Sequence, residues 1–375
     1  VHYSYYNISM IIGIPQEIKI HEYRVSLTPE GAARLVDSGH QVLVQSHAGE
    51  AVGFSDLDYQ ASGAKIVASA QHVFDQAEMI IKVKEPQPDE CALLKKGQLL
   101  FTYLHLAADP IQTELLIKSG ATCIAYETIT DANGRLPLLK PMSEVAGRMS
   151  IQSGAHHLEK TQGGSGVLLS GASGVEPAKV LVIGGGVVGM NAAEVALGMG
   201  AEVTILDRQI LDYLTTFQQQ HASKLSLDLS TSKNIKHHLV HADLVIGAAL
   251  VAGAKAPKLI TKPMLKLMKK GSVLVDVSID QGGCFETSKV TTHDNPTYVV
   301  DGIIHYCVGN MPGAVAKTAT LALTNTTLPF IQNIANKGWN QAMLEDQHLK
   351  NGLNIHQGKI RHKAVAESLG YEFFN

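Results

Sequence analysis

The feature that most constrains the fold is a glycine-rich turn between a predicted strand and a predicted helix. Gly184-Gly-Gly186-Val-Val-Gly189 matches the pattern G-x-G-x-x-G, with an apolar β-branched run before it at 180–183 and a helix-compatible run after it at 190–199. Gly184 permits the tight turn, Gly186 lets the backbone approach a pyrophosphate, and Gly189 allows close packing of helix on strand. The turn therefore predicts a parallel α/β domain that binds a dinucleotide, the alternative being a glycine-rich turn with no ligand.

A carboxylate stands where such a domain binds the adenosine ribose. Residues 203–206 read as a second strand that ends in Asp207, 18 residues after Gly189. A carboxylate at this place binds the ribose hydroxyls and repels a 2′-phosphate, which favours NAD over NADP. Arg208 keeps NADP open as an alternative, because an adjacent guanidinium can accommodate that phosphate.

Short strands and helices alternate in two series along the chain. The first series occupies residues 10–135, the second begins at residue 179, and the chain turns helical after about residue 308. Such alternation predicts parallel sheets with helices on their faces. We expect an α/β protein of two doubly wound domains. A Rossmann dinucleotide-binding domain (139–308) is inserted in a discontinuous substrate-binding and catalytic domain (10–138 and 309–375).

Composition argues against several classes of function. The net charge is −3 and only 17% of residues are charged, so no field of one sign is available for nucleic acid or a membrane surface. The longest apolar run is too short to span a bilayer. The four cysteines form no CxxC pair and predict buried thiols in a reducing compartment, the cytoplasm. The densest histidine group has no third metal ligand at a suitable spacing, so we expect no metal. These histidines are His237, His238 and His241.

Four polar groups follow apolar strands, where α/β sheets place their ligands. His105 follows the strand 99–104 and is suited to exchange protons near neutral pH. Lys84 and Lys82 follow 79–81, and alternation places both on one face of a strand extending to residue 83. A lysine there can hold a carboxylate or polarise a carbonyl, the alternative being solvated edge lysines.

The other two groups stand beside the first strand and at the end of a later one. Arg24 precedes a helix that Thr28 caps, and is placed to fork a substrate carboxylate. Asp280 ends the predicted strand 273–279 and could hold an amine or a water beside the nicotinamide. The structural alternatives are a surface arginine and a histidine without a catalytic role.

Together these motifs resemble those of the alanine dehydrogenase/transhydrogenase family. The resemblance extends from Met10 to Glu367. The matching strings are Ile12-Gly-Ile-Pro15, Glu17-Ile-Lys19, Arg24-Val25, Leu27-Thr-Pro29, Lys82-Val-Lys-Glu-Pro86, Thr102-Tyr-Leu-His-Leu-Ala107, Pro141-Met-Ser-Glu-Val-Ala-Gly-Arg148, the glycine turn, Ala242-Asp-Leu-Val-Ile-Gly247, Gly253-Ala-Lys-Ala-Pro-Lys258, Ile279-Asp-Gln-Gly-Gly283, Thr291-Thr-His-Asp294 and Asn310-Met-Pro-Gly-Ala314.

The resemblance implies NAD-dependent oxidative deamination of L-alanine to pyruvate and ammonia, and the reverse reaction, in a homohexamer of two-domain subunits with a hinged cleft. It places Arg24 and Lys84 on the substrate carboxylate and carbonyl, His105 as the acid/base, and Asp280 as a second catalytic group. The cofactor contacts that it implies, besides the glycine turn, come from Ser143, Val187, Asp207, Ser230, Leu250, Ile279, Asp280, Asn310 and Met311.

The chain departs from the family pattern at a few positions. Ser278 and Gly309 stand where the family usually has Ala, Asp212 where a basic residue usually follows the ribose acid, and Lys289 where Arg is expected. The segment 208–241 matches poorly, so the adenosine-side contacts, Ser230 included, are the least supported. The alternatives are a nucleotide-binding subunit of a transhydrogenase, an enzyme like saccharopine dehydrogenase, and a non-catalytic NAD-binding redox sensor.

Overall fold

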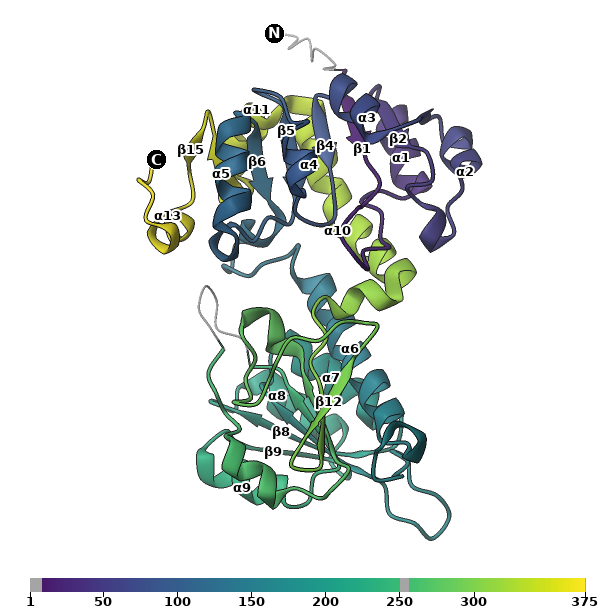
Figure 1. Ribbon diagram of the computed structural model, residues 1–375, viewed down its shortest axis with the longest axis vertical. Coiled ribbons are helices and arrows are strands. Elements are labelled where there is room, and N and C mark those ends of the chain that lie inside the picture. The colour runs from purple at the N-terminus through teal and green to yellow at the C-terminus, as the bar shows by residue number, and fades with distance from the viewer. Residues whose placement is uncertain (1–8, 250–255, 375) are drawn as a thin grey trace. The chain divides into compact units, whose positions relative to one another are not determined.

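The chain divides into two compact units. The computed structural model describes residues 9–249 and 256–374. One unit comprises the chain up to Met142 and from Val315 onward, and the second comprises Ser143–Ala314. In Figure 1 the first unit therefore contains both the purple beginning and the yellow end of the chain. The sequence prediction placed the two boundaries at 138/139 and 308/309.

The first unit is built on a mostly parallel sheet. Within the described residues this sheet has eight strands in the order β15-β14-β6-β5-β4-β1-β2-β3. Strands β1 to β6 are mutually parallel, and the hairpin β14–β15 adds an antiparallel edge beside β6. The strands are β1 (Ile11–Ile14), β2 (Gln41–Gln45), β3 (Lys65–Val67), β4 (Met79–Ile81), β5 (Leu99–Thr102), β6 (Thr122–Ala125), β14 (Leu353–His356) and β15 (Lys359–Ile360).

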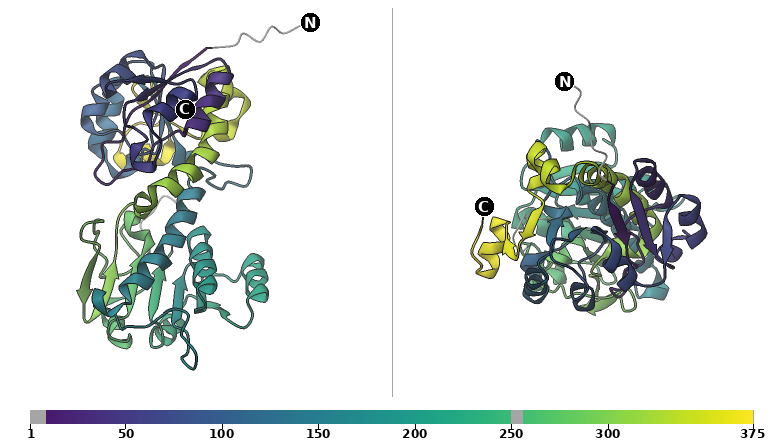
Figure 2. Two further views of the ribbon diagram at one scale, coloured as in Figure 1. Left: turned by 90° about the vertical axis from the view of Figure 1, so that its right-hand side faces the viewer. Right: turned by 90° about the horizontal axis from the view of Figure 1, so that it is seen from above.

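Helices connect these strands, and their ends follow local sequence signals. Thr28 caps α1 by accepting a hydrogen bond from the Gly31 amide at 3.1 Å, as predicted, with Pro29 in the first turn. The long helix α10 packs against α1 and α11, and Figure 2 shows it beside the purple N-terminal elements. The helices are α1 (Pro29–Asp37), α2 (Asp56–Ala61), α3 (Ala70–Gln76), α4 (Pro88–Cys91), α5 (Pro110–Ser119), α10 (Ala316–Lys337), α11 (Trp339–Glu345), α12 (Gln347–Lys350) and α13 (Lys363–Leu369); α6 (Lys140–His157) runs across the boundary of the units.

The second unit repeats this architecture with another sheet. Its strand order is β12-β13-β11-β10-β7-β8-β9 among the described residues, with β12 antiparallel to β13 and the other pairs parallel. The strands are β7 (Lys179–Ile183), β8 (Glu202–Asp207), β9 (Leu225–Leu229), β10 (Leu244–Gly247), β11 (Val273–Asp276), β12 (Thr297–Val300) and β13 (Ile303–Tyr306). The helices are α7 (Val187–Gly198), α8 (Asp212–Gln220) and α9 (Ser232–Leu239), with 3₁₀ turns η5 (Lys262–Leu267), η6 (Val277–Gln281) and η7 (Met311–Val315).

Both faces of the second sheet are buried, as a doubly wound fold requires. Along β7, Val180 and Val182 belong to one apolar cluster, whereas Leu181 and Ile183 belong to another. Because successive side chains of a strand point to opposite faces, the two clusters cover the two faces of the sheet. The predicted fold class, α/β with two doubly wound units, is confirmed. No helix in the described part of the chain has the length and apolar character needed to cross a membrane.

Two predicted strands were too long. The strand predicted for 79–83 ends at Ile81, and the chain then bends, so the expectation that Lys82 and Lys84 share one strand face is wrong. The strand predicted for 273–279 ends at Asp276, and Asp280 lies in the 3₁₀ turn η6 instead. Just after each strand a carboxylate accepts from the backbone: Glu17 from the Val83 amide after β4, and Asp276, the last residue of β11, from the Ser278 amide.

Candidate active site

The glycine turn of the second unit is shaped for a ligand that approaches its backbone. Gly184 has φ +109°, a conformation that favours glycine, and a Cβ on Gly189 would lie 1.8 Å from the Gly184 carbonyl oxygen. A Cβ on Gly186, by contrast, would meet nothing within 4 Å. Gly186 is the N-cap of α7, which begins at Val187, so the unpaired amides of the first helical turn lie close to this open space. The turn therefore fits a dinucleotide pyrophosphate.

Asp207 lies directly beside this turn. Its Oδ2 accepts a hydrogen bond from the Gly185 amide at 2.6 Å, and its backbone carbonyl accepts from the Ser230 amide at 2.8 Å. The structure thus brings the two predicted ribose-side residues together at the ends of β8 and β9. Tyr213 of α8, which the sequence reasoning missed, donates its hydroxyl to the Gly185 carbonyl at 2.8 Å. The Gly185 peptide is therefore held on both sides.

A second group of predicted cofactor residues gathers after β11 and β13. Ile279 is buried in η6 and Asp280 is exposed beside it. A Cβ on Gly309 would lie 3.3 Å from Asp280 Oδ1, which places Asp280 next to Gly309 and the following Asn310. Asn310 has φ +58°, and Met311 is buried at the start of η7.

Two further predicted cofactor contacts lie apart from these groups. Ser143 is partly buried in the first half of α6, and no contact described here connects it with the other predicted residues. Leu250 lies outside the described residues. Both stay predictions.

In the first unit, Arg24 is fully buried and its guanidinium forms an ion pair with a carboxylate of the protein itself. Its Nε and Nη2 donate to the two carboxylate oxygens of Glu22, at 2.6 and 2.5 Å. Its Nη1 points at the Met142 sulfur at 3.0 Å. The alternative of a surface arginine is wrong. The predicted fork binds Glu22 in this structure, and this bidentate contact fixes the orientation of the guanidinium.

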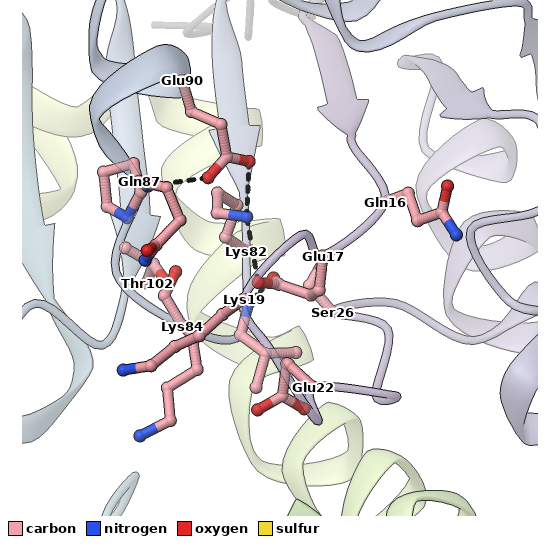
Figure 3. Close-up of polar contacts among 12 residues, drawn as sticks. Gln16, Glu17, Lys19, Glu22, Ser26, Lys82, Lys84, Gln87, Glu90 and Thr102 are labelled. Atoms are coloured by element: carbon pink, nitrogen blue, oxygen red, sulfur yellow. Dashed lines mark hydrogen bonds and ion pairs between the residues drawn. The ribbon is translucent and has the colours of Figure 1, made fainter.

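Lys82 is the centre of a fully buried ion-pair triad (Figure 3). Its Nζ lies 2.9 Å from Glu17 Oε2 and 2.8 Å from Glu90 Oε1. Burial alone would lower the pKa of Lys82, but the two carboxylates outweigh it and raise it, so this lysine stays charged. The alternative of solvated edge lysines is wrong for Lys82. Glu17 also accepts from the Val83 amide at 2.6 Å, which ties the triad to the backbone that carries Lys84.

His105 is held at the carboxyl end of β5 by two carboxylates. It has φ +51°, unusual for a residue with a Cβ, and its amide donates to Glu127 Oε1 at 2.6 Å. Its ring Nδ1 lies 3.8 Å from Glu85 Oε2. The imidazole is exposed, so it is accessible to a substrate.

Glu85 interacts with His105, Lys84 and Lys19. Burial raises its pKa, but His105, Lys84 and Lys19 outweigh burial and hold the pKa well below its usual range. Glu85 also forms an ion pair with Lys19. Lys84 and His105 therefore both act on the Glu85 carboxylate.

A polar cavity of about 370 Å³ opens beside Arg24. Its lining comes from the loop after β1 and from the turn after β2: Gln16, Glu17, Lys19, His21, Glu22, Tyr23, Arg24, His47, Ala48, Glu50 and Ala51. This volume suits a small polar molecule, and Arg24 is its buried cation. No group of three or more His, Cys, Asp or Glu side chains among residues 9–249 and 256–374 is arranged to hold a metal ion.

Two patterns of one known protein family match the chain. The pattern of the alanine dehydrogenase/PNT N-terminal domain matches residues 13–146, and that of the alanine dehydrogenase/PNT C-terminal domain matches residues 150–363. The chain belongs to the alanine dehydrogenase/PNT family. The resemblance seen in the sequence is thereby confirmed.

Members of the alanine dehydrogenase/PNT family resemble the chain over nearly its whole length. An alanine dehydrogenase of Halomonas elongata is 60% identical, with 97% of this chain and 98% of the relative covered. A solved L-alanine dehydrogenase is 48% identical with a TM-score of 0.93, covering 96% of this chain and 99% of that one. A transhydrogenase from Sinorhizobium meliloti is 24% identical with a TM-score of 0.80, covering 94% of this chain and 99% of that one, which shows a shared fold.

Proposed function

We propose that the protein catalyses the NAD-dependent oxidative deamination of L-alanine to pyruvate and ammonia, and the reverse reductive amination. Membership of both units in the alanine dehydrogenase/PNT family is the observation that carries this proposal. The alanine dehydrogenases that resemble the chain act, by their names, on this substrate.

NAD is the cofactor, and the second unit is proposed to hold it. The open backbone at Gly186 would receive the pyrophosphate, and Asp207 would bind the ribose hydroxyls. Ile279, Asn310 and Met311 would contact the nicotinamide end of NAD. Ser143, Ser230 and Leu250, which the family resemblance implies as cofactor contacts, would contact other parts of the NAD molecule. NAD supplies the acceptor for a hydride. We propose residues 139–308 as the NAD-binding domain, and 10–138 with 309–375 as the substrate-binding domain.

The first unit is proposed to bind and activate the substrate. Arg24, oriented by Glu22, binds the carboxylate of alanine. The ammonium group of alanine first gives one proton to solvent, and loss of hydride from Cα then leaves an iminium ion, to which water adds while His105 takes a proton of that water. Lys84 and Asp280 stabilise the neutral carbinolamine that forms. His105 returns its proton to the nitrogen, the nitrogen also takes the hydroxyl proton, and it departs as ammonium to leave pyruvate. In this sequence alanine, NAD⁺ and water give pyruvate, ammonium, NADH and one proton, so atoms and charge balance.

Assembly and location are part of the proposal. We propose a homohexamer, as the family resemblance implies, and the 17% charged residues are in keeping with covered subunit surfaces. Light scattering should give a mass six times that of the chain, and a monomer mass would contradict this. The four cysteines are unpaired and buried, which supports a reducing compartment, the cytoplasm.

The test is a matrix of substrates against cofactors, read as NADH or NADPH absorbance. L-Alanine with NAD should give the fastest rate, with L-serine and glycine slower, L-lysine inactive and NADP poor. Activity with L-lysine and 2-oxoglutarate only would favour an enzyme like saccharopine dehydrogenase. Hydride transfer between two nicotinamides without any amino acid would favour a transhydrogenase.

A further inference from the structure

The turn that carries Asp280 is tied together by a single buried carboxylate. Asp276, at the end of β11, has no exposed surface. Its Oδ1 accepts from the Ser278 amide at 3.1 Å, at the start of the turn. Its Oδ2 accepts from the Cys284 and Phe285 amides at 2.9 and 3.3 Å, and from the Ser288 hydroxyl. Asp276 therefore joins the two ends of the segment 277–288.

A lysine collects the carbonyl groups of the same turn. Lys258 Nζ donates to the carbonyl oxygens of Gly282, Gly283 and Phe285 at 2.5, 2.8 and 3.1 Å. An ammonium group has three N–H donors, and all three of Lys258 bond to backbone carbonyls of the segment 282–285. Lys258 is exposed at the surface, and two of these three hydrogen bonds are partly buried.

The negative charge of Asp276 and the positive charge of Lys258 bind opposite ends of the peptide groups in the turn. Amides of the turn point to the carboxylate of Asp276, while carbonyls of Gly282 and Gly283 point to Lys258. The two glycines have φ +88° and +74°, and a Cβ on Gly283 would lie 2.6 Å from Asp276 Oδ2. The sequence Gly282-Gly283 is thus needed to close the turn around the carboxylate, which is a use for these glycines apart from cofactor contact.

We propose that Lys258 and Asp276 are positioning residues that together hold the turn 277–288, and through it Asp280, for the reaction. Asp280 itself is exposed, so its place depends on the turn more than on packing of its own side chain. The inference rests on the proposed function, in which Asp280 stabilises the carbinolamine. A misplacement of about 1 Å at a reacting group can cost on the order of 100-fold in rate.

The test compares Lys258→Met, Lys258→Arg and a control, Lys269→Met, in the full-length protein. Lys269 is a partly exposed lysine of the same unit that pairs with Asp243 at 2.7 Å, away from the turn. We expect Lys258→Met to lower kcat for L-alanine at least about tenfold, with KM for NAD changed less than about threefold. Amide hydrogen exchange should rise in 277–288 and nowhere else. Lys258→Arg should restore most of kcat, because a guanidinium can also donate to several carbonyls, and Lys269→Met should behave as wild type.

Two results would overturn the proposal. One is unchanged exchange in 277–288 for Lys258→Met, and the other is a kcat within about threefold of wild type although exchange has risen. Asp276→Asn, which keeps the shape of the side chain but replaces an acceptor oxygen by an NH₂ group, should give the same pattern as Lys258→Met. If wild-type protein does not oxidise L-alanine, the proposed function fails, whereas the exchange measurement still decides whether Lys258 holds the turn.

Discussion

Replacing Lys82 by methionine should destabilise the first unit more than any single surface change. The substitution keeps an unbranched side chain that is one atom shorter, but removes the only cation of the triad with Glu17 and Glu90. Both carboxylates are buried, with at most 3% of either side chain exposed, so water cannot replace the lost partner. Two carboxylates would then face each other in the interior.

The magnitude follows from the geometry. At 2.9 and 2.8 Å, each Nζ–O contact is worth about 6 kcal/mol of attraction for an effective dielectric constant of about 20, most of it offset by the desolvation of the charges. Breaking a buried pair by removing one partner costs about 3–5 kcal/mol. For a domain of roughly 200 residues this corresponds to a fall in Tm on the order of 10 °C.

Glu17→Gln is the matched control. It removes one of two buried negative charges, leaves Lys82 paired with Glu90, and keeps an oxygen that can accept from the Val83 amide. Burial raises the pKa of Glu17, so its charge is costly to keep in the interior. We expect a loss of about 1 kcal/mol, or about 2–4 °C. Scanning calorimetry of both variants at one protein concentration is the assay, and equal shifts for the two would refute the reasoning.

Three further changes test the site. His105→Ala should abolish NADH formation from L-alanine and leave NADH binding, measured by fluorescence titration, nearly intact; near-wild-type turnover would falsify the acid/base role. Asp207→Ala should reduce the preference for NAD over NADP at least about tenfold, since one ribose contact of about 1.4 kcal/mol is a factor of 10; an unchanged preference in the ratio of kcat/KM values would remove the ribose role. Glu85→Gln should lower Tm at neutral pH, because burial, which raises the pKa of Glu85, is outweighed by His105, Lys84 and Lys19, which lower it from 4.5, so that its ionised form stabilises the fold. That contribution is present above about pH 4.5 and is lost as the pH falls through the lowered pKa, so the Tm gap to wild type should close only below about pH 4.5, and a gap independent of pH would contradict the assignment.

Local patterns predicted most of the fold. The runs that became β1, β2, β7 and β10 are short and apolar, and α1 has a capping threonine followed by proline. These signals are local, because each depends only on residues a few positions apart in the sequence. The hairpin β14–β15 escaped prediction, because the chain after about residue 308 is expected to be helical and β14 pairs with the distant strand β6.

Long-range charge pairing was the part of the site that the sequence reasoning missed. For Lys82 the sequence leaves open a lysine that holds a substrate group and a solvated edge lysine, since nothing near it in the sequence shows that Glu17, 65 positions earlier, would reach it. Asp276 read as one more strand position because its partners lie up to 12 residues further on. Glu22 could have been found, because it stands two residues before Arg24 and a carboxylate at that spacing can reach a guanidinium.

The central claim is that hydride passes from Cα of L-alanine to the nicotinamide of NAD. The most direct measurement uses L-alanine deuterated at Cα, with NADH, pyruvate and ammonia analysed by mass spectrometry and enzymatic assay. The account predicts NADH that carries one deuterium, with pyruvate and ammonia formed in equal amounts to it. NADH without deuterium, or deuterated alanine left unchanged while another amino acid is oxidised, would contradict it.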